Sequence, residues 1–112
     1  LLDSEDILKA LTPNFNKLIN LEGQGLIVSS KSNEYDFVSR YFCPKYGINE
    51  DPVTGSAHTS LIPYWSERLD SNELIAKQVS KRSGVLYCKN KDTRVLISGK
   101  AVLYMKGEIE LS

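Results

Sequence analysis

The chain has 112 residues, of which 41% are hydrophobic and 25% are charged, and its 14 basic and 14 acidic side chains give a formal net charge of zero. This length suits one domain and excludes two independent cores, and the composition is that of a folded globular protein. Because the charges cancel, the sequence argues against a nucleic-acid or anionic-membrane surface, although a local basic patch stays open.

The first third of the chain predicts a short helix and a β-hairpin. Asp3 is a candidate N-cap of a helix that ends at Thr12-Pro13, because the residue before a proline disfavours the helical conformation. A short strand is predicted over 26–28. Its hairpin partner is predicted over 35–42, because apolar and polar side chains alternate there after a polar turn.

The longest predicted helix covers residues 55–69. Its apolar side chains fall on one broad arc of the helix surface: Ala57, Leu61, Tyr64, Trp65 and Leu69. Ser66 falls on the opposite side. Because Pro63 lacks the amide donor that a helix interior requires, we expect a kink there.

The last third predicts short strands over 74–80, 85–88, 94–98 and 101–105, separated by polar or glycine-containing turns. The first of these segments also has helical propensity. Together, the predicted elements indicate an α+β fold, in which one mostly antiparallel sheet wraps around one central helix.

No apolar run reaches the length of a membrane span, and the first residues do not resemble a signal peptide. Cys43 and Cys88 form no C-x-x-C or metal-ligand spacing, so we expect free thiols in a cytoplasmic protein. The chain begins with Leu1-Leu2, and a processed product, a trimmed chain and a fragment are all compatible with this start.

The segment that precedes the long helix has the residue types of an anion-binding site. Asp51 before a proline opens a turn, and Thr54 is a second candidate cap. The amides of Gly55, Ser56 and Ala57 are then unsatisfied donors at the positive end of the helix dipole, where carboxylates and phosphates bind.

Two further groups belong to this helix start. The Ser56 side chain adds a hydroxyl, and His58 is a candidate proton donor within the first turn. The same residues are also compatible with helix capping and no ligand, and a lone histidine is more often a surface or hydrogen-bonded core residue. The segment is not a P-loop, because it lacks the G-x-x-x-x-G-K-[ST] pattern.

The block EDPVTGSAH, residues 50–58, resembles the PhzF-like (phenazine biosynthesis-like) isomerase family. The surrounding family pattern is met at these positions: Arg40, Phe42, Pro44, Gly47, Glu50, Asp51, Pro52, Thr54, Gly55, Ser56, Ala57 and Tyr64. The closing segments AKQVSKRSGVLYC and RVLISGKAVLYMKGEIEL also resemble the family, with Ser83-Gly84 where it usually has Gly-Gly. The resemblance covers nearly the whole chain.

This resemblance implies the fold of diaminopimelate epimerase, in which two lobes each wrap a sheet around a central helix and the active site lies between them. Family members are much longer, so residues 1–112 resemble the C-terminal lobe alone. The principal acid/base glutamate of the family belongs to the first lobe, and no residue of this chain inherits that role.

The implied chemistry is an isomerisation or epimerisation that removes and returns a proton at carbon of a small carboxylate substrate, without metal or organic cofactor. The resemblance assigns Asp51 as catalytic and Gly55, Ser56, Ala57 and His58 as substrate-binding. The expected partners are the substrate and the N-terminal lobe; a homodimer is left open. The alternative is a non-catalytic small-anion-binding or assembly module that retains the fold.

The remaining polar and thiol side chains of this region are expected to be structural. Cys43 and Cys88 are interpreted as packing residues, because the central helix begins with glycine and serine rather than with a nucleophilic thiol. Glu50 is interpreted as mainly structural, and Arg40 and Arg82 as ion-paired or solvated.

Overall fold

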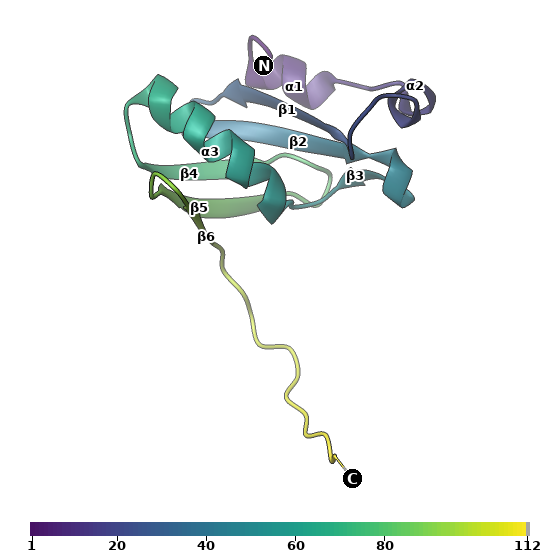
Figure 1. The fold of residues 1–112 in the computed structure, drawn as a ribbon, viewed down its shortest axis with the longest axis vertical. Coiled ribbons are helices and arrows are strands. Elements are labelled where there is room, and N and C mark those ends of the chain that lie inside the picture. Colours follow the sequence, from purple (N-terminus) through teal and green to yellow (C-terminus); the bar gives the residue numbers. More distant parts are fainter. Residues whose placement is uncertain (112) are drawn as a thin grey trace.

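The computed structural model describes residues 1–111. Along the chain it contains helices, strands and one short 3-10 helix with these bounds: α1 Glu5–Ala10, α2 Phe15–Ile19, β1 Leu26–Lys31, β2 Phe37–Cys43, η1 Pro44–Tyr46, β3 Ile48–Asp51, α3 Gly55–Leu69, β4 Glu73–Gln78, β5 Gly84–Asn90 and β6 Val95–Ser98. Figure 1 shows α3 lying across the sheet.

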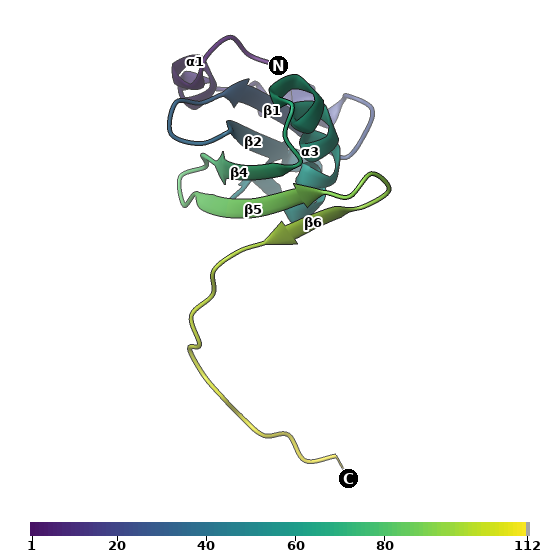
Figure 2. The same cartoon turned by 90° about the vertical axis from the view of Figure 1, so that its left-hand side faces the viewer.

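The strands form one six-stranded sheet with the order β1-β2-β4-β5-β6, and β3 pairs with β2 beside this path. Figure 2 shows this order. Within the described chain every pairing is antiparallel except that of β2 with β4, which is parallel. The predicted α+β fold, a mostly antiparallel sheet around one central helix, is confirmed.

One face of the sheet packs against α3. Trp65 stacks on Phe37 with ring centroids 5.5 Å apart, and its Nε1 donates to Ser29 Oγ at 2.8 Å. The buried side of the helix differs from the predicted arc, because Tyr64 and Leu69 are exposed whereas Ser66 is buried. The sheet covers the side centred on residues 58, 61, 62 and 65, which follow helical spacing.

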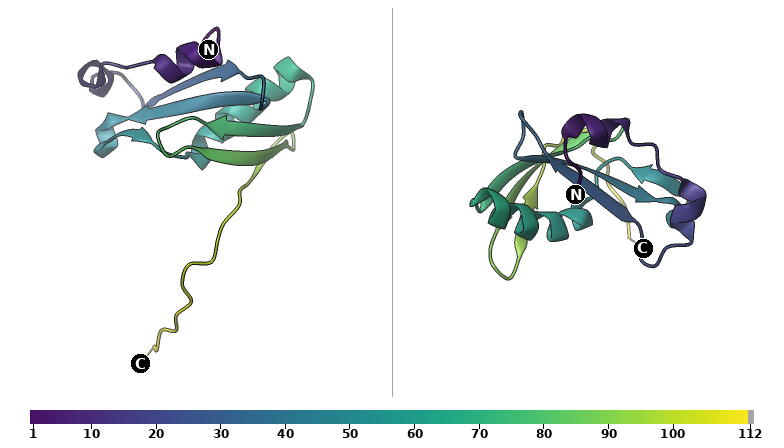
Figure 3. Two further views of the ribbon diagram at one scale, coloured as in Figure 1. Left: turned by 180° about the vertical axis from the view of Figure 1, so that it is seen from behind. Right: turned by 90° about the horizontal axis from the view of Figure 1, so that it is seen from above.

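The opposite face of β1 and β2 is covered by α1 and α2 (Figure 3). Consecutive side chains of a strand point to opposite faces, so Phe37 packs under α3 whereas Val38 packs under α1. The N-cap of α1 is Ser4, whose Oγ accepts from an amide at 3.2 Å, and not the predicted Asp3. The five-residue helix α2, capped by Asn14, was not predicted.

The predicted strand over 101–105 is wrong. After β6 the chain has no regular secondary structure up to residue 111 and runs away from the sheet (Figure 1). The side chains of Val102 and Tyr104 are 93% and 95% exposed. A strand requires a neighbour for its backbone donors and acceptors, and no described segment lies beside this one.

Candidate active site at the start of α3

Strand β3 places Asp51 beside the start of α3. The sequence suggested a loop over this region, but residues 48–51 pair with the end of β2, and Asp51 lies opposite Tyr41. The chain then turns through Pro52 and enters α3 at Gly55. The carboxylate that the sequence singled out is therefore carried by the end of a strand, and three residues separate it from the helix.

A hydrogen-bonded cluster fixes the turn between β3 and α3. The Thr54 hydroxyl donates to Asp51 Oδ2, and the Thr54 amide donates to Gln78 Oε1 at 2.7 Å. Gln78 Nε2 donates to the Asp51 carbonyl at 2.9 Å and to Thr54 Oγ1 at 3.0 Å. Gln78 is fully buried at the end of β4. No local sequence pattern indicates this role, because its partners lie 24 to 27 residues away.

The same cluster leaves the first amides of α3 without side-chain partners. Thr54 occupies the N-cap position, but its hydroxyl is directed to Asp51 and not to the helix, so the predicted side-chain cap is wrong. Within residues 1–111 no side chain accepts from the amides of Gly55, Ser56 or Ala57. Gly55 and Ser56 are exposed, and no neighbouring atom lies within 4 Å of where a Gly55 Cβ would stand.

The first of these residues, Gly55, lines a cavity of about 620 Å³, which we call the α3 groove. Three segments line it: residues 51–53 with Gly55, residues 82–86 of the β4–β5 turn and β5, and residues 97–100 at the end of β6. The start of α3 is thus open to a groove and not sealed beneath the neighbouring strands.

The structure brings two of the five sequence-predicted site residues to this groove. Asp51 and Gly55 line it, and Ser56 is the next, exposed residue of α3. Ala57 has a buried side chain, so only its backbone amide, in the first turn of α3, is a candidate for binding a ligand.

His58 is not brought to the groove. Its ring is fully buried and packs against Phe37, with ring centroids 5.9 Å apart. Nδ1 lies 2.8 Å from the Thr54 carbonyl oxygen, and Nε2 has no hydrogen-bond partner within the described chain. Burial lowers the pKa of this imidazole below its ordinary value, which outweighs the opposite effect of the Thr54 carbonyl.

Arg40, which the sequence predicted to be ion-paired or solvated, forms an ion pair with Glu50. The guanidinium donates through Nε and NH2 to both carboxylate oxygens, at 3.0 and 2.7 Å. Its NH1 donates to the carbonyls of Leu8 and Leu11, which ties β2 and β3 to the end of α1. The donors of this arginine are therefore occupied by the protein.

Both cysteines are buried packing residues, as expected. Burial raises the pKa of the Cys43 thiol, and it raises the pKa of Cys88 to about 11. Neither thiol belongs to the α3 groove.

Within residues 1–111, no three His, Cys, Asp or Glu side chains are grouped as metal ligands, and no helix is both long and apolar enough to cross a membrane.

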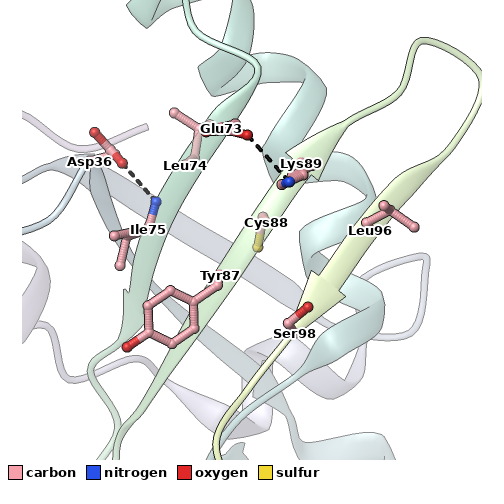
Figure 4. A pocket seen from close by; sticks show the side chains of 9 residues that line it. All are labelled: Asp36, Glu73, Leu74, Ile75, Tyr87, Cys88, Lys89, Leu96 and Ser98. Carbon is pink, nitrogen blue, oxygen red and sulfur yellow. Dashed lines mark hydrogen bonds and ion pairs between the residues drawn. The ribbon is translucent and has the colours of Figure 1, made fainter.

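A second cavity, of about 510 Å³, lies on the face of β4, β5 and β6 that is turned away from α3 (Figure 4). Ile75, Tyr87 and Leu96 contribute exposed apolar surface. Its charged groups bond to other groups of the protein: Glu73 pairs with Lys89 at 3.3 Å, and an Asp36 oxygen accepts from a β4 amide at 2.7 Å. None of the sequence-predicted site residues lies here.

The family model for phenazine biosynthesis-like proteins, PhzC-PhzF, matches residues 1–107. The chain belongs to the PhzC-PhzF family. It is 51% identical to an uncharacterized isomerase of Pseudomonas aeruginosa over 110 residues, and 52% identical to one of Halalkalibacterium halodurans over 112 residues. Each match covers 98% of this chain and 42% of the relative.

A crystal structure of a PhzF family protein from Enterococcus faecalis has the same fold, with a TM-score of 0.87 and 51% sequence identity. The alignment covers 99% of this chain and 43% of that protein. This PhzC-PhzF chain therefore spans less than half the length of the relatives that it matches.

Proposed function

We propose that this chain is one lobe of a PhzF-like isomerase that removes and returns a proton at carbon of a small carboxylate substrate. The family match and the relatives named as isomerases support this reaction class. The observation that carries the proposal is the juxtaposition of the open α3 amides with the Asp51 carboxylate at one groove.

The helix start supplies the electrostatic part of the reaction. When a carbon next to a carboxylate loses its proton, negative charge moves onto the carboxylate oxygens. The amides of Gly55, Ser56 and Ala57 have no side-chain acceptor within residues 1–111, and in the proposed complex they stabilise that charge without reorganising. The dipole of the fifteen-residue helix α3 acts in the same direction. The Ser56 hydroxyl adds a donor to the same carboxylate.

Asp51 supplies a proton-transfer group at the edge of this seat. The Thr54 hydroxyl binds Oδ2 and so fixes the orientation of the carboxylate, while Oδ1 has no hydrogen-bond partner within residues 1–111. A positioned carboxylate with one free oxygen is suited to exchange a proton with a bound substrate. His58 would act only indirectly, through the packing of the first turn.

The other acid/base group is proposed to lie outside this chain. We interpret residues 1–112 as the C-terminal lobe and assign the principal glutamate to an N-terminal lobe that would close the groove. The chain spans 42% of the isomerases that it resembles, so their remaining length accommodates such a lobe. The proposed reaction uses no metal or organic cofactor, and a cytoplasmic location is proposed with it.

The test is proton exchange in the complete protein. Asp51→Asn and Ser56→Ala are each expected to slow the incorporation of solvent deuterium into substrate by at least about tenfold, as lost proton transfer or charge stabilisation predicts. Glu67→Gln and Ser60→Ala are matched controls, because both side chains are exposed on α3 away from the groove. Exchange that is unchanged in both site variants would reject the assigned roles.

The alternative is an anion-binding or assembly module without turnover. The bond between Asp51 and Thr54 favours it, because this bond gives the carboxylate a structural task in the turn. Binding of a carboxylate at the α3 amides, combined with an absence of carbon-bound deuterium exchange in the complete protein, would support this alternative over the isomerase.

A further inference from the structure

We propose that Arg82 binds a second anionic group of the substrate, so that the substrate is a small molecule with at least two anionic groups. The inference rests on the proposed function, because it takes the open amides of α3 as the seat of the first carboxylate. It adds a specificity-determining residue that neither the motif nor the family match assigns.

The turn that carries Arg82 is attached to the loop that enters α3. Ser80 Oγ donates to the Pro52 carbonyl at 2.8 Å, and the Ser83 amide donates to Ser80 Oγ at 2.9 Å. Gly84 packs so closely on this loop that an added Cβ would lie 2.3 Å from Val53 Cγ2. Arg82 is therefore held at the groove by contacts on both sides of it in the sequence.

The Arg82 side chain is exposed, and its guanidinium has no partner within residues 1–111. Within residues 1–111 no acidic side chain lies within ion-pair distance of it, and no carbonyl accepts from it. The contrast is Arg40, whose donors bind Glu50 and the end of α1. Arg82 lines the α3 groove and also an adjoining cavity of about 430 Å³.

The charged residues that line the groove favour an anion. Arg82 and Lys100 line it together with a single acidic residue, Asp51. Glu50 lines the adjoining cavity, but its carboxylate is already paired with Arg40. A planar guanidinium binds carboxylate or phosphate oxygens in pairs, so it selects for anionic groups by geometry as well as by charge.

The rest of the groove lining is mixed. Apolar side chains come from Val53, Val85, Leu86 and Ile97, and Ser83 and Ser98 are polar. The lining therefore does not restrict the body of the ligand to an apolar one. Small dicarboxylates carry two anionic groups on one short molecule, so they are the simplest probes of this site.

The experiment compares dicarboxylates with matched monocarboxylates. Amide NMR shifts of Gly55, Ser56 and Ala57 in the complete protein are followed during titration with unbranched dicarboxylates from malonate to pimelate. Each is paired with the monocarboxylate of equal carbon number. The same titrations are repeated with Arg82→Gln, with Arg82→Lys, and with Arg94→Gln, an arginine that lies outside the groove.

At least one dicarboxylate is expected to bind at least about tenfold more tightly than its monocarboxylate, and Arg82→Gln is expected to remove this difference while monocarboxylate binding is unchanged. Arg82→Lys should retain part of it, and Arg94→Gln all of it. A dicarboxylate preference that survives in Arg82→Gln, or no preference in the parent protein, overturns the inference and leaves the proposed function standing. If no carboxylate shifts the signals of these amides, both the inference and the proposed function are overturned.

Discussion

His58 is a buried histidine whose protonation is linked to folding. Its pKa in the folded chain is lowered by burial, whereas the unfolded chain has the ordinary value of about 6.5. Above that pH both states are neutral, and the free energy of unfolding does not depend on this residue. As the pH falls below 6.5 the unfolded state binds the proton more readily, so the folded state loses stability.

The prediction is that the free energy of unfolding decreases between pH 7 and pH 5, with a contribution of up to about 1.4 kcal/mol per pH unit from His58. Urea unfolding at a series of pH values measures it. His58→Gln should be less stable at pH 7 but should show a smaller decrease towards pH 5. An identical pH dependence in the two proteins would contradict the prediction.

The residues of the site differ in how far the sequence could predict them. Asp51 and the amides of Gly55 to Ala57 are adjacent in the chain, so a local motif was sufficient to find them. Gln78 and Arg82 reach the site through the β4–β5 hairpin, and the Thr54 hydroxyl accepts from Gln78 Nε2 and donates to Asp51. Such positions depend on tertiary pairing, which periodicity does not encode.

The elements with a strong periodic pattern were predicted with nearly the observed bounds. The helix over 55–69 is α3, and the hairpin partner over 35–42 is β2 at 37–43. In contrast, β3 has four residues and its first two side chains are exposed, so it has no alternation to detect. It is a strand because β4 pairs with β2 only at residues 37–39, which leaves the same edge of β2 open to β3 at residues 41–43.

The β4–β5 turn provides a test at the level of elements. Gly84→Ala would push a Cβ into Val53, and we expect it to lower the free energy of unfolding by about 1–3 kcal/mol through overpacking. Gly107→Ala is the matched control, because no atom lies within 4 Å of that position. Chemical denaturation of the two variants makes the comparison.

A double substitution identifies the cause of this effect. Val53→Ala removes the methyl groups that an added Cβ at position 84 would meet, so Gly84→Ala should cost less in that background than in the parent protein. If the two substitutions are additive, the turn is not held by this contact.

At the scale of the whole molecule, the segment after β6 stands apart from the rest. The Cα radius of gyration is 16.0 Å, against about 13 Å for a compact chain of this length, and the extended tail accounts for the excess. Its apolar side chains are among the most exposed of the described chain, although their pattern resembles a strand.

Because residues 101–111 pack against no other part of the described chain, their removal should change the free energy of unfolding by less than about 0.5 kcal/mol. Truncation after Lys100 keeps that side chain over the Tyr87 ring and so isolates the effect of the tail. Thermal and urea unfolding of the two chains make the measurement. A loss of several kcal/mol would show that the tail folds back onto the sheet.

The parallel pairing of β2 with β4 has a consequence for where a ligand can bind. Two neighbouring strands that run in the same direction need a connection that returns the chain to its starting edge, and here α3 makes that return. The helix must therefore begin at the carboxyl ends of both strands, where Gln78 meets Thr54. Open α/β sheets bind their ligands at this same edge. Connectivity alone thus places the start of α3 at the edge where we propose that the substrate binds.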